Sequence, residues 1–128
     1  PDFILLAMNQ HGQVDFRIEL RGGPGGSQAR AVAPQAGRPA YTAPWIALSD
    51  GAHFIELGWW AATGPRDRNG RMDFLVDGQL AASKSGLGNH GRQVDAIRLG
   101  AVTGANAGTH GTFYIDAFAS TTGYPIGP

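Results

Sequence analysis

The chain has 128 residues, of which 42% are hydrophobic and 16% are charged, so it can form one globular domain and is too apolar for a disordered tail. Its 10 basic and 10 acidic residues balance, so we expect no nucleic-acid partner and no attraction to an anionic membrane surface. The absence of cysteine excludes disulfides, thiolate metal sites and a cysteine nucleophile, and no apolar run reaches the roughly 20 residues that insertion across a membrane needs.

Short apolar segments separated by turn residues predict an all-β fold. The 20 glycines and 8 prolines fall between these segments and do not form one linker. The clearest strand covers residues 13–21, where apolar residues from Val14 to Leu20 alternate with charged ones, so one face is predicted to be buried and the other solvated. The other predicted strands in this half of the chain cover residues 3–8, 28–33 and 41–48.

The second half of the chain continues the same pattern. Asp77 and Gly78 both tolerate positive φ, so they predict a tight type I′ turn between two strands. No segment combines helix caps with a 3.6-residue apolar period, so we expect no substantial helix. The predicted strands here cover residues 53–60, 71–76, 79–83, 94–101 and 112–120, which brings the total to about nine.

Four segments carry a family resemblance. They are residues 53–57 (HFIEL), 74–78 (FLVDG), 94–101 (VDAIRLGA) and 111–118 (GTFYIDAF). In this order they resemble the C-terminal portion of concanavalin A-like lectin/glucanase (laminin-G-like) domains of large secreted bacterial proteins. The resemblance implies an antiparallel jelly-roll β-sandwich, with residues 1–128 as a single partial domain that lacks its first strands. It also implies a secreted, extracellular or cell-surface location.

An incomplete sandwich would leave sheet edges unpaired and part of a hydrophobic face uncovered, which favours strand addition. We therefore expect a non-catalytic structural or adhesive module of a secreted, cell-surface or fibre-forming protein. Its partners would be copies of itself or other parts of the same extracellular assembly. The alternative is a lectin-like carbohydrate-binding module, including an appendage of a polysaccharide-active enzyme, with glycans as partners.

Aromatic residues are the candidate contacts for a ligand or a partner. Alternation places Trp59 in the core, whereas Phe54 and Trp60 point to the other face of the same strand. With Tyr114 on the last predicted strand, these two residues are the candidate contact residues. Trp45 is a further aromatic residue able to stack on a sugar ring.

The sequence predicts no catalytic site. Asp15, Arg17 and Glu19 share a strand face, but they do not match the Glu-x-Asp-x-x-Glu pattern of related glucanases, so we interpret them as a solvated charge ladder. No Ser-His-Asp arrangement has support from spacing. The glycine-rich residues 86–91 precede a strand where a dinucleotide site needs a helix.

Only one residue is a candidate metal ligand. The four histidines have no metal-ligand spacing, and the acidic and amide residues between 67 and 73 lack the spacing of an EF-hand. Similar sandwiches use an acidic residue on the last strand to hold a structural Ca²⁺, which makes Asp116 the candidate. The alternative for Asp116 is a hydrogen-bonding role, and no other cofactor is expected.

Overall fold

The computed structural model describes residues 2–22, 25–92, 94 and 96–103, with side-chain surroundings for residues 7–22, 25–92 and 94. In these ranges the chain is all-β and contains no helix. The predicted strand at residues 112–120 lies outside them. The strands are β1 (Asp2–Met8), β2 (Val14–Arg21), β3 (Ser27–Gln35), β4 (Arg38–Thr42), β5 (Ile46–Leu48), β6 (Ile55–Trp60), β7 (Gly70–Val76), β8 (Gln79–Leu87) and β9 (Ala96–Thr103).

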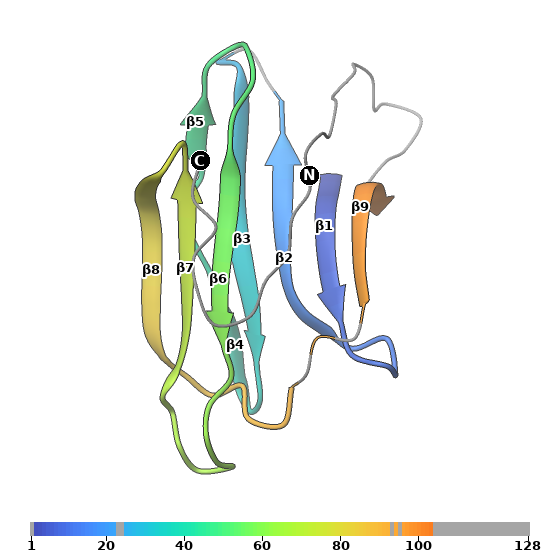
Figure 1. Ribbon diagram of the computed structural model, residues 1–128, viewed down its shortest axis with the longest axis vertical. Helices are drawn as coiled ribbons and strands as arrows, with labels where there is room; N and C mark the ends of the chain where they lie inside the picture. The colour runs from blue at the N-terminus through green and yellow to red at the C-terminus, as the bar shows by residue number, and fades with distance from the viewer. Residues whose placement is uncertain (1, 23–24, 93, 95, 104–128) are drawn as a thin grey trace.

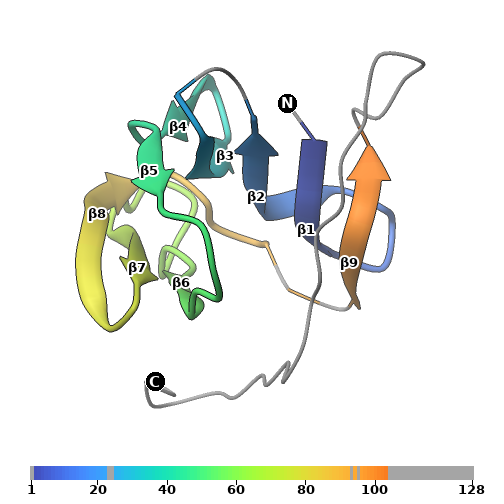
Figure 2. The same ribbon diagram turned by 90° about the horizontal axis from the view of Figure 1, so that it is seen from above.

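These strands form two antiparallel sheets that lie face to face (Figures 1 and 2). Sheet A has the order β4-β3-β2-β1-β9, with β5 also paired to β3, and sheet B has the order β6-β7-β8. Strands β1 to β4 and β6 to β8 pair in sequence order, β5 pairs with β3, and β9 returns from sheet B to pair with β1. Sheet B lies against the β3 side of sheet A, where β3 and β7 are in contact (Figure 2).

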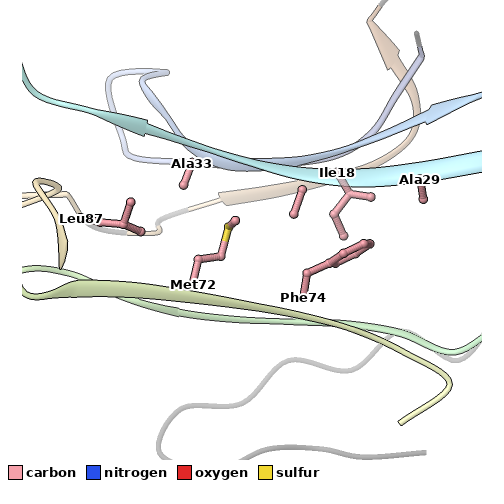
Figure 3. Packing of buried hydrophobic residues seen from close by; sticks show 7 residues of the cluster. Ile18, Ala29, Ala33, Met72, Phe74 and Leu87 are labelled. Atoms are coloured by element: carbon pink, nitrogen blue, oxygen red, sulfur yellow. The ribbon is translucent and has the colours of Figure 1, made fainter. Parts of the chain in front are cut away.

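The core between the sheets combines small side chains from sheet A with large ones from sheet B. Figure 3 shows the two sets pointing toward each other, with Ile18 next to the ring of Phe74. Small residues opposite large ones let the two sheets interdigitate at the density of a protein interior. The buried core residues are Ile18, Ala29, Ala31 and Ala33 from sheet A, and Met72, Phe74 and Leu87 from sheet B.

Two predicted strands differ from the observed ones. Residues 41–48 do not form one strand, because β4 ends at Thr42 and β5 begins at Ile46. Pro44 lies in the gap and has no amide proton to continue a ladder. The strand predicted to end at residue 83 continues to Leu87, because its pairing with β7 resumes beyond a register shift and reaches Gly70.

The prediction of a solvated charge ladder on β2 is wrong for both of its carboxylates. Asp15 is 0% exposed and Glu19 is 1% exposed. Asp15 falls at a register shift between β1 and β2, where Ala7 pairs with Phe16 and Met8 with Val14, so the strict alternation breaks there. Glu19 is covered because arginines from two strands reach across it.

Candidate functional site

Trp60 lies on the outer face of sheet B, at the end of β6. Its side chain is 51% exposed. Gly58 precedes it on the same face, and a Cβ added there would lie 2.9 Å from Cη2 and 3.1 Å from Cζ3 of the indole. The six-membered ring of Trp60 therefore rests on the backbone at Gly58, which only a glycine leaves free for it. This position confirms that alternation directs Trp60 away from the core.

Charged and polar side chains lie on the strands beside Trp60. Arg71 is its cross-strand neighbour, with the guanidinium carbon 5.6 Å from the ring centroid. Arg71 donates through Nε and Nη2 to the two carboxylate oxygens of Asp73, at 3.1 and 2.9 Å. Ser83 donates to Asp73 Oδ1 at 2.6 Å. We call Trp60, Gly58, Arg71, Asp73 and Ser83 the Trp60 platform.

Asp73 is ionised at neutral pH in this arrangement. Burial alone would raise the pKa of its carboxyl group, but the hydrogen bonds from Arg71 and Ser83 and the positive charge of Arg71 outweigh burial, so the pKa lies below 3.8. The platform thus holds a carboxylate that accepts hydrogen bonds and a guanidinium that donates them, next to an exposed aromatic ring.

Asn89 fixes the backbone beneath Trp60. Its side chain is fully buried, accepts a hydrogen bond from Ala62 N at 2.7 Å and donates one to Trp60 O at 3.2 Å. Gly70 makes room for it, because a Cβ at Gly70 would collide with Asn89 Oδ1. Sequence reasoning missed this residue, because a single asparagine in a glycine-rich segment matches no binding pattern.

The other predicted contact residues are not part of the platform. Phe54 is half-buried and precedes β6, at the opposite end of that strand from Trp60. Its amide donates to Asp77 Oδ1 at 2.9 Å, and its carbonyl accepts from Asp77 N at 2.7 Å. Tyr114 and Asp116 lie outside the described residues. Trp59 packs against the core as predicted, with its ring centroid 5.7 Å from that of Phe16.

A second aromatic residue, Trp45, lies against two arginines of sheet A. The guanidinium carbons of Arg21 and Arg30 lie 4.1 and 4.2 Å from its ring centroid. Arg21 Nε donates to Gln28 Oε1 at 2.7 Å. Trp45 directly precedes Ile46, which pairs with Ala29, so it lies beside Arg30 across the strand pair. We call Trp45, Arg21, Arg30 and Gln28 the Trp45 cluster.

The buried carboxylate of Glu19 adjoins this cluster. Arg17 Nε and Arg30 Nε each donate to one of its oxygens at 2.7 Å, and the two arginine side chains are 24% and 25% exposed. Burial alone would raise the pKa of Glu19, but the hydrogen bonds from Arg17 and Arg30 outweigh burial, and the pKa lies below its ordinary value of 4.5. Glu19 therefore stays charged and holds both guanidinium groups in place.

The structure also brings together a serine, a histidine and an aspartate that sequence spacing did not connect. His53 Nδ1 lies 2.8 Å from Asp77 Oδ2, and Nε2 lies 3.3 Å from Ser49 Oγ and 2.7 Å from Ser49 O. A carbonyl oxygen only accepts, so Nε2 must carry a proton there. A general base needs that nitrogen unprotonated. This geometry makes His53 a link between two turns, and Nε2 is not placed to take a proton from Ser49.

No cluster of three or more His, Asp or Glu side chains in the described ranges is placed to hold a metal ion. Asp67 and Asn69 face their own loop, where each is hydrogen-bonded to Thr63. The calcium role of Asp116 stays a prediction. In the same ranges, no helix is long and apolar enough to cross a membrane.

Comparison of the chain with protein-family models, with curated proteins and with solved structures finds no match. The resemblance to concanavalin A-like domains therefore remains an expectation from sequence.

Proposed function

We propose that this chain is a non-catalytic carbohydrate-binding module and that sugar rings stack on the Trp60 platform. The observation that carries the proposal is a half-exposed indole that lies against Gly58 of the sheet, beside a charged hydrogen-bonding pair. The apolar face of a pyranose packs on an aromatic ring, while its hydroxyl groups need donors and acceptors at the edge. Arg71 supplies donors and Asp73 supplies acceptors beside Trp60.

The proposal includes a jelly-roll sandwich of the concanavalin A-like kind, in a secreted or cell-surface protein. The resemblance of the strand and turn sequences supports it, as does the return of β9 from sheet B to the edge of β1. Two-sheet sandwiches often place ligands on an exposed sheet face or on the loops at its ends. A structural Ca²⁺ at Asp116 remains a separate prediction.

Replacement of Trp60 tests the proposal. We expect Trp60→Ala to lower the affinity for bound glycans about tenfold or more, because the aromatic stacking surface is lost and nothing else replaces it. A glycan array followed by isothermal titration with the retained sugars measures the change. The far-ultraviolet circular dichroism spectrum and melting temperature should stay close to those of the parent, because half of the side chain is already exposed.

Leu80→Ala is the matched control. Leu80 is 58% exposed and also lies on sheet B, so this variant removes an exposed apolar side chain from β8 without touching the Trp60 platform. We expect its glycan affinity to equal that of the parent. Retention of every glycan by Trp60→Ala, or an equal loss in Leu80→Ala, would contradict the proposal.

A second candidate function is assembly through protein contacts, as the sequence first suggested. The observation that favours it is the exposure of Leu80 on β8, which is an edge strand of sheet B in the part of the chain that the structure describes. Leu80 pairs with Leu75 of β7. Assembly predicts that the parent sediments as oligomers without any glycan, and that Leu80→Ser releases monomers. A monomeric parent that binds glycans supports the carbohydrate-binding proposal alone.

A further inference from the structure

The Trp45 cluster and its neighbours carry an excess of positive charge on a protein with no net charge. The guanidinium groups of Arg21 and Arg30 both lie on Trp45, and Arg30 is also paired with the carboxylate of Glu19. Because the whole chain is neutral, this excess is local and no chain-wide field accounts for it. In the part of the chain that the structure describes, Glu19 pairs with Arg30, and the guanidinium of Arg21 has no carboxylate partner.

The two arginines on Trp45 are held with their terminal nitrogens available. Arg21 uses Nε to bind Gln28, and Arg30 uses Nε to bind Glu19. Within the described part of the chain, the Nη groups of these two arginines make no hydrogen bond. A guanidinium with its Nε occupied still presents the planar Nη edge, which matches the paired oxygens of a carboxylate or a sulfate group.

Stacking on the indole lowers the cost of ordering these side chains for a ligand. A free arginine loses rotamer freedom when it binds, whereas Arg21 and Arg30 already lie 4.1 and 4.2 Å from the Trp45 ring. Glu19, whose side chain is only 2% exposed, also holds Arg30 in place by accepting a hydrogen bond from its Nε. Arg21 is exposed, so an anion reaches it from solvent.

We propose that the Trp45 cluster is a second binding site, which takes the carboxylate or sulfate groups of an acidic polysaccharide. The anion site stands on the geometry of Arg21, Arg30 and Trp45, and the choice of a polysaccharide as its carrier rests on the proposed function. Arg30 alternates with the core residues Ala29 and Ala31 on β3, so this site lies on the outer face of sheet A, whereas the Trp60 platform lies on the outer face of sheet B. Figure 2 shows that the two sheets lie face to face.

Binding of the purified chain to three immobilised polymers tests the proposal: polygalacturonate for carboxylate, dextran sulfate for sulfate, and dextran as the neutral reference. We expect the chain to be retained on at least one charged polymer and not on dextran. This retention should weaken as the salt concentration rises from 0.02 to 0.3 M. Arg21→Gln should lower the affinity about fivefold, because one exposed charge-assisted contact is lost. The charged polymer that retains the chain identifies the anion.

Arg66→Gln is the matched control, because it removes the same charge from an exposed loop at the other end of the molecule, between β6 and β7 (Figure 1). Its affinity should equal that of the parent. Arg21→Lys keeps the charge but loses the planar edge, and we expect an intermediate affinity, which an effect of charge alone would not produce. Trp60→Ala should leave binding to the acidic polymer unchanged, so the proposal for this site and the proposal for the Trp60 platform are tested independently.

Three outcomes would overturn the inference. The first is equal loss in Arg21→Gln and Arg66→Gln, which would mean attraction to net charge only. The second is equal retention on dextran and on the charged polymers. The third is full affinity in both Arg21 variants, which would leave the stacking on Trp45 as a purely structural contact.

Discussion

Gly58 determines how Trp60 is presented. The indole ring occupies the space that a side chain at position 58 would take, and no other residue type provides that space without moving the ring. The absence of a Cβ at Gly58 therefore lets the indole lie against the backbone of the sheet.

Gly58→Ala tests this role. The added Cβ would lie 2.9 Å from Cη2 of Trp60, too close for both groups to keep their positions. Because the indole is half exposed, we expect it to swing away while the strands stay paired, with a change in melting temperature of only a few degrees. Glycan affinity should fall nearly as far as in Trp60→Ala, as measured by isothermal titration.

Gly22→Ala is the control for this change, because a Cβ at Gly22 meets no atom within 4 Å. This variant adds the same methyl group where it meets no other atom, so it should leave glycan affinity unaltered. Normal glycan binding by Gly58→Ala would show that the position of the ring on the backbone does not matter for recognition.

Single residues were predictable from sequence only where alternation decides their side. The period of two correctly placed Trp59 inward and Trp60 outward. It failed for Glu19, because burial there depends on Arg30, which lies on the next strand at a register that no local pattern shows. The position of the Trp60 ring also depends on its contact with Gly58, and spacing alone does not fix a rotamer.

At the scale of elements, His53 joins two turns that the sequence separates. It precedes β6, while Ser49 follows β5 and Asp77 begins the turn between β7 and β8. The hydrogen bond to Asp77, followed by the one to Ser49 O, raises the pKa of His53 above 6.5. The hydrogen bond from His53, followed by that from Phe54 N, lowers the pKa of Asp77 below 3.8.

These shifts predict how stability depends on pH. A raised histidine pKa means that its contribution is complete below pH 6.5 and is lost as pH rises through the higher folded value. A lowered aspartate pKa means that its contribution is present above pH 3.8 and is lost as pH falls through the lower folded value. We expect the melting temperature to decrease between pH 6 and pH 9, as followed by circular dichroism.

His53→Gln should remove most of this decrease, because the replacement does not titrate. His11→Gln serves as the comparison, since His11 is exposed and lies on the turn between β1 and β2. An identical pH profile in the parent and in His53→Gln would contradict the role of His53 as a charged link.

The elements themselves followed well from sequence where turn chemistry was specific. Asp77 and Gly78 have φ values of 53° and 79°, as the type I′ prediction requires. The prediction failed between residues 41 and 48, where β-forming residues on both sides concealed the interruption at Pro44. The link from His53 to Asp77 was hidden because the two residues are 24 positions apart.

At the scale of the whole molecule, the all-β class and the antiparallel sheets were predictable, and their arrangement was not. Short strands and tight turns predict neighbours that pair in sequence order, which β1 to β4 and β6 to β8 confirm. Nothing local indicates that β9 pairs with β1, because the two strands lie at opposite ends of the described part of the chain. The Trp60 platform and the Trp45 cluster each combine residues from different strands.

Because the two sheets pack together by their inner faces, each candidate site lies on its own outer face of the molecule. The Trp60 platform and the Trp45 cluster lie on the outer faces of different sheets, so on the two proposals a copy bound to one glycan through Trp60 would still offer its arginines to a second, acidic polysaccharide. We expect the parent to make a mixture of the two polymers turbid, and Trp60→Ala or Arg21→Gln to keep it clear. On these two proposals, one copy would join two kinds of polysaccharide chain without pairing with a copy of itself.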